Sequence, residues 1–246
     1  MKTSSKFLVT ASLLNSFFYF KNYDEDILAD KFGSGDYVPK SNEEIRKEFL
    51  QTLSRDKFEP SEAMQKGIDF ENKVQFLTTN LTVEDLRNFY HEETGQTVIN
   101  NKLTIADVIE WLEKRPDYLI AQIVKNGIWQ TAISKSLQIG SIEYLLYGKS
   151  DVMKEDTIYD IKFTTKGSNY DVGKYQDSAQ HRIYLYCSGL PKFAYLISDG
   201  NNFWREDYVN HDKIEDEIKA MIAEFISYIK SDAEMAQLYF GRWNAK

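Results

Sequence analysis

The chain is poor in the residues that build cysteine and histidine sites. Its 246 residues include one cysteine, Cys187, and three histidines, His91, His181 and His211, which lie far apart in the sequence. One cysteine excludes a disulfide within the chain, a cysteine zinc site and an iron–sulfur cluster. The spacing of the histidines argues against a histidine zinc site. So little cysteine suits a reducing compartment, and we expect a cytoplasmic protein.

Proline is scarce, and long apolar runs are missing as well. Four prolines beside 16 tyrosines and 15 phenylalanines argue against long disordered tails. The apolar run at residues 7–20 is too short to cross a membrane and is interrupted by Ser12, Asn15 and Ser16. No small-residue cleavage site follows it. We therefore expect a buried N-terminal helix there, not a signal peptide, and no membrane partner.

Charge and composition indicate an ordinary globular protein. Hydrophobic residues make up 42% of the chain and charged residues 28%, with a formal net charge of −8. That sign argues against a protein whose main task is to coat nucleic acid by releasing counterions. It leaves room for an enzyme that handles a phosphate backbone through a local basic groove and bound cations.

The hydrophobic pattern changes period near the middle of the chain. Capping signals predict helices in the first half, at about 41–53, 60–77, 82 onward, 104–114 and 116–127. The second half predicts a meander, a helix, a hairpin and a last helix, at 128–138, 141–153, 157–165, 172–188, 193–198, 203–209 and 212–230. We expect one α/β domain over 1–246, with a mainly helical part (1–127) and a sheet core with a C-terminal helix (128–246).

Two aspartates face each other in the predicted meander. A turn at Glu155-Asp156 sets Asp151 opposite Asp160, and Lys149 opposite Lys162. Like charges facing across a strand pair cost about 0.2–1 kcal/mol each. The pattern therefore indicates either a different register, which a longer turn would give, or a cation between the aspartates.

Other polar side chains can reach the same point. Asp160 and Lys162 lie two residues apart and share a strand face, although a solvated polar face is the plain alternative. Glu71 follows Gly67 by one helical turn, and the glycine would let that helix approach closely. A surface carboxylate is the alternative for Glu71.

A later helix offers a glutamine and a tyrosine one turn apart. Gln180 and Tyr184, with Gln176 a turn earlier, can hydrogen-bond a phosphate oxygen or orient the lysine, although Tyr184 can also be purely structural. Positive charge nearby could come from Lys166, Lys174 and Arg182.

These groups suit metal-dependent phosphodiester hydrolysis. Carboxylates and backbone carbonyls are hard oxygen ligands for Mg²⁺ or Mn²⁺, which polarise a phosphate and acidify a bound water. Lys162 can orient that water or neutralise developing charge. Gly148-Lys149-Ser150 looks like the end of a nucleotide-binding P-loop, but Glu143 stands where its first glycine is needed and a strand follows. No nucleotide cofactor is expected.

The motifs together resemble the PD-(D/E)XK nuclease superfamily, and most of all its RecB-type and lambda-exonuclease-like branch with stand-alone phage nucleases. The matching elements, in order over most of the chain, are Thr10–Ser16, Gly67-x-x-x-Glu71, Gly148-x-x-Asp151, Asp160-Ile161-Lys162 and Gln180-x-x-x-Tyr184. The chain departs from many relatives in carrying Asp160 where they have glutamate, and in lacking the cysteines of the iron–sulfur types.

The resemblance implies a restriction-endonuclease-like core, with a central mixed sheet of about five strands flanked by helices. It implies that Glu71, Asp151, Asp160 and the Ile161 carbonyl bind Mg²⁺ or Mn²⁺, that Lys162 is the catalytic lysine, and that Gln180 and Tyr184 are the signature pair.

The expected function is DNA hydrolysis, by an exonuclease in recombination, repair or phage DNA processing, in a bacterial or phage-infected cell. A recombinase or single-strand-annealing protein and a second copy of the chain are further candidate partners. The alternative is an inactive nuclease-fold protein that binds nucleic acid or a protein.

Overall fold

The computed structural model describes residues 6–25, 39–57, 59–95, 104–165, 167 and 170–245. The strands in these residues are β1 (Lys6–Thr10), β2 (Ile128–Ile139), β3 (Ile142–Lys154), β4 (Thr157–Phe163), β5 (Lys192–Ser198) and β6 (Phe203–Val209). The helices in the same residues are α1 (Ala11–Lys21), α3 (Asn42–Ser54), α4 (Glu62–Leu77), α5 (Val83–Thr94), α6 (Ile105–Glu113), α7 (Pro116–Val124), α8 (Ala179–Ser188), α9 (Ile214–Ser231) and α10 (Ala233–Arg242).

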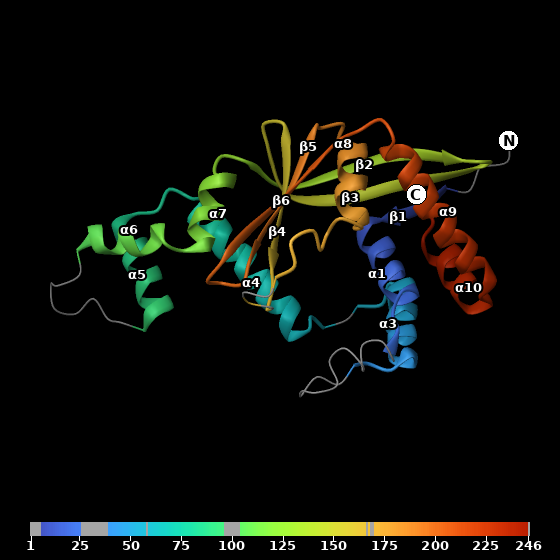
Figure 1. Cartoon of the computed structure of the whole chain (residues 1–246), viewed down its shortest axis with the longest axis horizontal. Helices are drawn as coiled ribbons and strands as arrows, with labels where there is room; N and C mark the ends of the chain where they lie inside the picture. Colours follow the sequence, from blue (N-terminus) through green and yellow to red (C-terminus); the bar gives the residue numbers. More distant parts are fainter. Residues whose placement is uncertain are drawn as a thin grey trace.

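The six strands form one mixed sheet, so the expected α/β class is confirmed. The order is β1-β3-β4-β5-β6, with β2 paired to β3 (Figure 1). β1–β3 and β4–β5 are parallel, whereas β2–β3, β3–β4 and β5–β6 are antiparallel. The predicted meander and hairpin are both present, and β1 is an addition that the sequence pattern did not predict.

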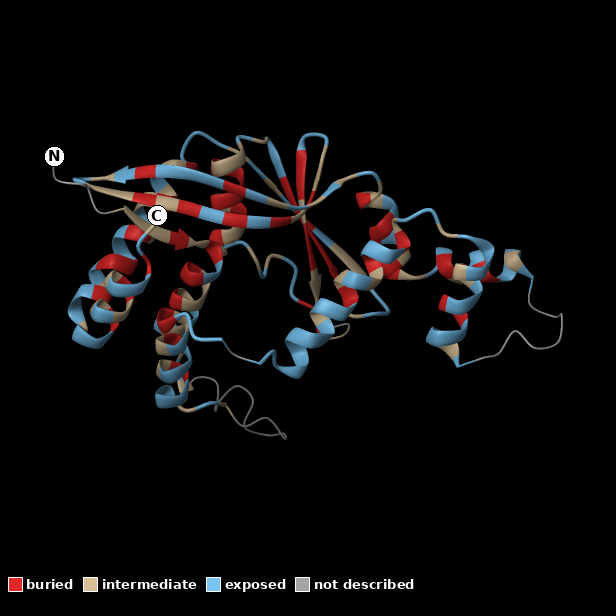
Figure 2. Ribbon diagram, turned by 180° about the vertical axis from the view of Figure 1, so that it is seen from behind, coloured by how far each residue is buried: buried red, intermediate tan, exposed pale blue. Residues whose placement is uncertain are grey.

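Helices cover the sheet with two separate cores. The first core gathers α1, α3, α8, α9 and α10 against the sheet, and the second gathers α4 to α7. Strand β5 contributes to both, because Tyr195 and Ile197 pack into the first core and Leu196 into the second. Buried residues concentrate in the central strands and in the helix faces toward them (Figure 2). α5 and α6 extend to one side, away from the other helices (Figure 1).

Local capping chemistry sets the first helices where the sequence predicts them. Ser41, Thr82 and Thr104 each form a full capping box, which satisfies free backbone N–H groups at the helix start. Ser61 caps α4 through its hydroxyl, and Pro116 occupies the first turn of α7. These five helices are confirmed, and the four ends that the sequence predicted lie within about three residues of the observed ones.

Three expected boundaries are wrong. The run at 7–20 is not one helix, because β1 occupies its start and α1 begins only after the N-cap Thr10. The helix expected from residue 172 begins at Ala179, because residues 172–177 form turns and Gly173 has a φ of +92°. The expected cap Asp212 is not used, since α9 has Lys213 at its N-cap position without a side-chain cap. Among the described helices, none is both long and apolar enough to cross a membrane.

Candidate active site

The predicted residues meet where one edge of β3 is left open. On that edge β1 pairs with residues 143–147, ending at Thr10 opposite Tyr147, and β4 pairs only with residues 152–154. Residues 148–151 therefore lie between two neighbouring strands without a ladder partner on that side. Gly148-Lys149-Ser150 is part of the strand, as expected for a segment that is not a nucleotide loop.

The expected register is confirmed, but the ladder stops before the two aspartates. Val152 pairs with Tyr159 and Lys154 with Thr157, around the turn at residues 155–156. Asp151 and Asp160 follow in the same register, yet they are not paired in the ladder. Instead the Asp151 Oδ2 accepts a hydrogen bond of 2.7 Å from the Ile161 N–H. The strand pair thus opens at the point of like charge.

Asp160 is held from two sides. It is 1% exposed, and the Lys162 ammonium lies 2.5 Å from its Oδ2. The Gln180 side-chain amide donates a hydrogen bond to its Oδ1. The Oδ2 contact has the distance of an ion pair, but no donor among the described residues meets it with hydrogen-bond geometry. Gln180, the first partner of the expected signature pair, therefore orients the carboxylate of Asp160.

Glu71 is brought to the same region by α4. Its Oε1 accepts a hydrogen bond of 2.5 Å from the side-chain amide of Gln130 on β2. Burial raises the pKa of Glu71, and the nearby negative charge of Asp160 raises it further. Although Glu71 lies eighty positions before Asp151 in the sequence, its carboxylate lies within electrostatic range of both aspartates and of Lys162.

The three carboxylates and the lysine form one coupled electrostatic cluster. Burial raises the pKa of Asp151 well above its usual range, and the charges of Asp160 and Glu71 add to this effect. Burial alone would lower the pKa of Lys162, but the charges of Asp160 and Asp151 outweigh it and the pKa is raised. Concentrating negative charge here therefore has a free-energy cost, which a bound cation would lower.

Tyr184 packs directly on the open stretch of β3. Its ring fills the space above Gly148, where an added Cβ would lie 2.1 Å from the ring carbon Cε1. Its hydroxyl donates a hydrogen bond of 3.0 Å to the Lys149 carbonyl, and the side chain is 5% exposed. Burial raises the pKa of Tyr184 to about 12, so the hydroxyl stays protonated. In this structure Tyr184 supports the strand that carries Asp151.

A cavity of about 560 Å³ opens beside this cluster. The N-terminal ends of two helices line it, α1 through Thr10 and α8 through Ser178, together with Lys149 and Lys162. Its described lining contains no Asp or Glu. Helix N-termini and lysines both favour negative charge, so the cavity suits a phosphate group.

One asparagine joins the two helix ends. Asn15 on α1 accepts a hydrogen bond from the Ala179 N–H at 2.8 Å and donates one to the Ser178 hydroxyl at 3.0 Å. The first of these bonds satisfies one backbone N–H in the first turn of α8 from outside the helix, and the second holds the N-cap side chain of that helix. Sequence reasoning did not single out Asn15, because its partner lies 163 positions away.

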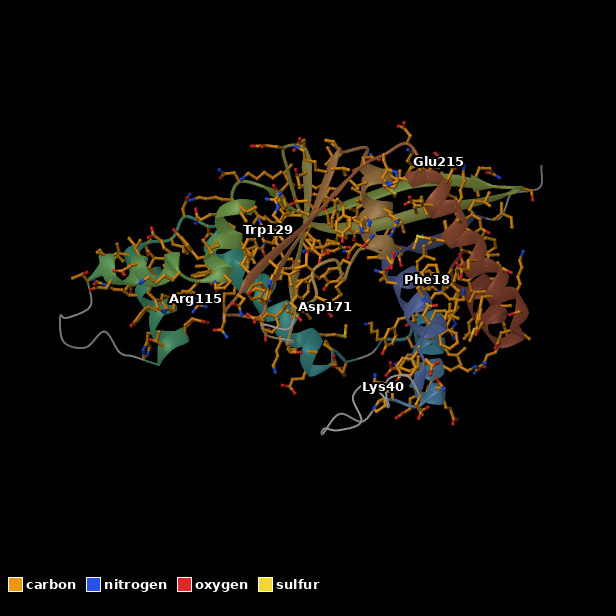
Figure 3. All side chains as sticks on the ribbon, viewed as in Figure 1. Phe18, Lys40, Arg115, Trp129, Asp171 and Glu215 are labelled. Atoms are coloured by element: carbon orange, nitrogen blue, oxygen red, sulfur yellow. The ribbon has the colours of Figure 1, made fainter. Side chains whose placement is uncertain are left out.

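A buried glutamate fixes the loop that approaches the cavity from the other side. Glu206 on β6 accepts hydrogen bonds from the Tyr170 and Tyr208 hydroxyls and from the Gly173 N–H, at 2.5, 2.7 and 2.8 Å. Burial alone would raise the pKa of Glu206, but these hydrogen bonds lower it. The held loop places Tyr175 in the cavity lining, stacked 4.4 Å from the ring of Tyr195. Figure 3 marks Asp171 in this loop, ahead of α8.

The donor set matches a hard divalent cation in chemistry. Glu71, Asp151 and Asp160 supply carboxylate oxygens, the ligands that Mg²⁺ and Mn²⁺ prefer. The charge of Asp160 raises the pKa of both Glu71 and Asp151. Among the described residues, however, no three His, Cys, Asp or Glu side chains are arranged so as to hold one metal ion. The carboxylates are turned to Gln130, the Ile161 N–H, Gln180 and Lys162.

Several expected contributions lie elsewhere. A Cβ on Gly67 would meet nothing within 4 Å, so this glycine does not serve a close approach of α4. Gln176 lies exposed in the turns before α8 and not on the helix. Arg182 forms an ion pair with Glu217 on α9 at 2.9 Å. Lys174 lies outside the lining of this cavity. Lys166 lies outside the described residues.

Gln130 is a further site residue that sequence reasoning missed. It has a φ of +55°, and Asp151, the residue opposite it in the β2–β3 register, has no pairing partner. Leu146 and Val152 would share a face in a regular strand, yet they belong to different cores. This irregularity changes the direction of β2 and β3 at the site. No sequence pattern typical of strands predicts it.

Comparison with known proteins gives little further information. No family model matches the chain, and no curated protein matches it. Among solved structures the chain is similar to one described as "Crystal structure of SSO0001". The two share 15% sequence identity at a TM-score of 0.39, over 66% of this chain and 85% of that one. A likeness at that level carries no argument about function.

Proposed function

We propose that this chain is a divalent-metal-dependent DNA nuclease of the PD-(D/E)XK type. The observation that supports it most is the cluster of Glu71, Asp151 and Asp160 with Lys162, in which burial and neighbouring negative charge raise the pKa of Glu71 and Asp151, and neighbouring carboxylates raise that of Lys162. A partly buried group of like charges costs stability, and such perturbed groups cluster at functional sites. The open edge of β3 and the basic cavity beside it add a place for the phosphodiester.

In this proposal the chain's own residues have distinct tasks. The three carboxylates, with the Ile161 carbonyl, would hold Mg²⁺ or Mn²⁺ once they turn from their present partners, Gln130, the Ile161 N–H, Gln180 and Lys162. The ion would polarise the phosphate and acidify a bound water. Lys162 stays protonated and neutralises charge that develops on the phosphate. Gln180 orients Asp160, and Tyr184 supports the strand carrying Asp151. The substrate phosphate sits at the N-terminal ends of α1 and α8.

The biological setting is part of the same proposal. We infer an exonuclease of recombination, repair or phage DNA processing, acting in the cytoplasm. DNA is its partner, and a recombinase or single-strand-annealing protein works beside it.

Cleavage assays test the proposal directly. Linear single-stranded, linear double-stranded and circular DNA are incubated with Mg²⁺ or Mn²⁺ and with the wild-type chain, Asp160→Ala or Lys162→Ala. We expect wild type to degrade linear DNA and both variants to lose at least about a hundredfold in rate. Nicked circles would indicate an endonuclease. If wild type and variants bind DNA and are equally inert, the nuclease proposal is wrong and a binding protein on this fold replaces it.

A further inference from the structure

A second cavity, of about 630 Å³, adjoins the first. Asn15, Tyr175 and Ser178 line both cavities. The second cavity continues along α1 toward its C-terminal end, and its other wall is the loop at residues 174–178. A strand whose phosphate lies in the first cavity can therefore place a neighbouring group in the second.

Four of the ten described residues that line the second cavity are aromatic. Phe18, Tyr19 and Tyr23 come from α1 and the residues after it, and Tyr175 comes from the opposite wall. Figure 3 marks Phe18 on α1. Tyr19 is 57% exposed, and its ring centroid lies 5.6 Å from that of Tyr23 at an interplanar angle of 63°. Exposed aromatic rings beside a phosphate site are the surface on which unpaired bases stack.

The charges of the two cavities are opposite in kind. The first has Lys149 and Lys162 and no carboxylate in its described lining. The described lining of the second has Lys174 together with two carboxylates, Asp24 and Asp177. Such a lining does not favour a phosphate, whereas it accommodates an uncharged ring. The amide of Asn22 adds a donor and an acceptor that match the polar edge of a base.

We propose that the second cavity binds an unpaired nucleobase of single-stranded DNA next to the phosphodiester in the first cavity. The inference rests on the proposed function for its choice of nucleic acid, and it adds the substrate class: a strand with at least one unpaired base at the site. A fully paired base has both faces covered by its neighbours in the stack and cannot enter.

Binding measurements test the base site independently of cleavage. Single-stranded oligonucleotides carry 2-aminopurine at successive positions, and Ca²⁺ replaces Mg²⁺ during the measurement. The variants are Tyr19→Ala, Tyr19→Phe, which keeps the ring, and Phe76→Ala, which removes a 39% exposed ring of α4 outside the cavity. Thermal midpoints establish that each variant is folded.

We expect Tyr19→Ala to weaken single-strand binding about tenfold, the effect of losing one stacked base. Tyr19→Phe and Phe76→Ala should bind as wild type does, and no variant should alter binding of a blunt duplex. In wild type, 2-aminopurine should be quenched at one position of the oligonucleotide, and Tyr19→Ala should abolish that quenching.

Three results would overturn the inference, and they do so in two distinguishable ways. If wild type cleaves DNA while Tyr19→Ala binds single strands as tightly and no position is quenched, the base site is wrong and the nuclease proposal stands. An equal loss in Tyr19→Ala and Phe76→Ala has the same meaning. If wild type neither binds nor cleaves any DNA, the nuclease proposal fails and the base site fails with it.

Discussion

Replacing Gly148 with alanine should destabilise the protein through one contact, with the ring of Tyr184. The new Cβ would lie 2.1, 2.8 and 2.9 Å from the ring atoms Cε1, Cζ and Cδ1. Carbon atoms in contact are normally about 3.5–4.0 Å apart, so the ring must move by more than about 1 Å. It cannot do so freely, because Tyr184 is buried in the first core.

The magnitude has two parts. Overpacking of a filled core costs about 1–3 kcal/mol. Moving the ring also strains the hydrogen bond of 3.0 Å between the Tyr184 hydroxyl and the Lys149 carbonyl, a bond worth about 1 kcal/mol. The free energy of unfolding should therefore fall by about 2–4 kcal/mol, which lowers the thermal midpoint of a chain of this size by roughly 5–15 °C.

Urea titrations of a double-mutant cycle measure this cost. In a Tyr184→Ala background the new methyl group meets no ring, so the cost of Gly148→Ala should drop below about 1 kcal/mol. Gly67→Ala is the matched control, since its Cβ meets nothing within 4 Å, and alanine should raise the stability of α4 by up to about 1 kcal/mol. An equal cost of Gly148→Ala in both backgrounds would refute the reasoning.

Three further outcomes follow from the site and its surroundings. Gln130→Ala frees Glu71 and should reduce metal affinity or cleavage rate about tenfold. Its free energy of unfolding should stay within about 1 kcal/mol of wild type, because Gln130 is exposed. Cleavage rates over a Mg²⁺ series measure the effect, and an unchanged rate contradicts it. Mg²⁺ at ten times its dissociation constant should stabilise wild type by about 1.4 kcal/mol, and Asp160→Asn should lose this gain in calorimetry; an equal shift in both contradicts it. Burial lowers the pKa of His181 from 6.5 to about 3, so the unfolded chain takes up a proton that the folded chain refuses, and stability falls as the pH decreases below about 6.5. Between pH 7 and pH 5, wild type should lose about 2 kcal/mol more than His181→Phe in urea titrations, and parallel pH profiles contradict it.

The helices of the first half could be predicted because residues close together in the sequence determine where each helix starts. A Ser or Thr followed three residues later by an acid satisfies two backbone donors of the same turn, whatever the rest of the chain does. Ser41, Thr82 and Thr104 behave in this way. The β3–β4 register was predictable for a similar reason, because a two-residue turn fixes which residues face each other.

The elements that were missed depend on partners far along the chain. Lys6–Thr10 is a strand because it pairs in parallel with residues 143–147 of β3, and its apolar sequence runs on into α1 without a break. Helix α10 packs on α3 and α9, and the indole N–H of Trp243 donates to the Leu53 carbonyl at 2.8 Å. No pattern within a short window of sequence carries such information.

The site shows the same division. Motif spacing indicated the three carboxylates, Glu71 among them, with Lys162 and Gln180, and the structure brings all of them together. The residues that hold them in place could not be predicted. Gln130 hydrogen-bonds Glu71 across 59 positions of sequence, and Asn15 hydrogen-bonds the start of α8 across 164. The role expected for Gly67 was wrong because one helical turn from Glu71 does not imply a close contact.

The unfavourable charge pair and the open strand edge are two consequences of one register. Continuing the β3–β4 ladder past Val152 would set Asp151 against Asp160 and Lys149 against Lys162, each pair at a cost of about 0.2–1 kcal/mol. The ladder ends instead, and opposite charges meet within β4, where Lys162 lies 2.5 Å from Asp160. Because the β3–β4 backbone hydrogen bonds are not formed there, residues 148–151 stay open on the edge that faces α8 and the N-terminal end of α1. Removing the repulsion should therefore close the site. With Asp151→Asn we expect the free energy of unfolding to rise at the expense of the cation site. Stability and cation binding cannot both be optimised at this position.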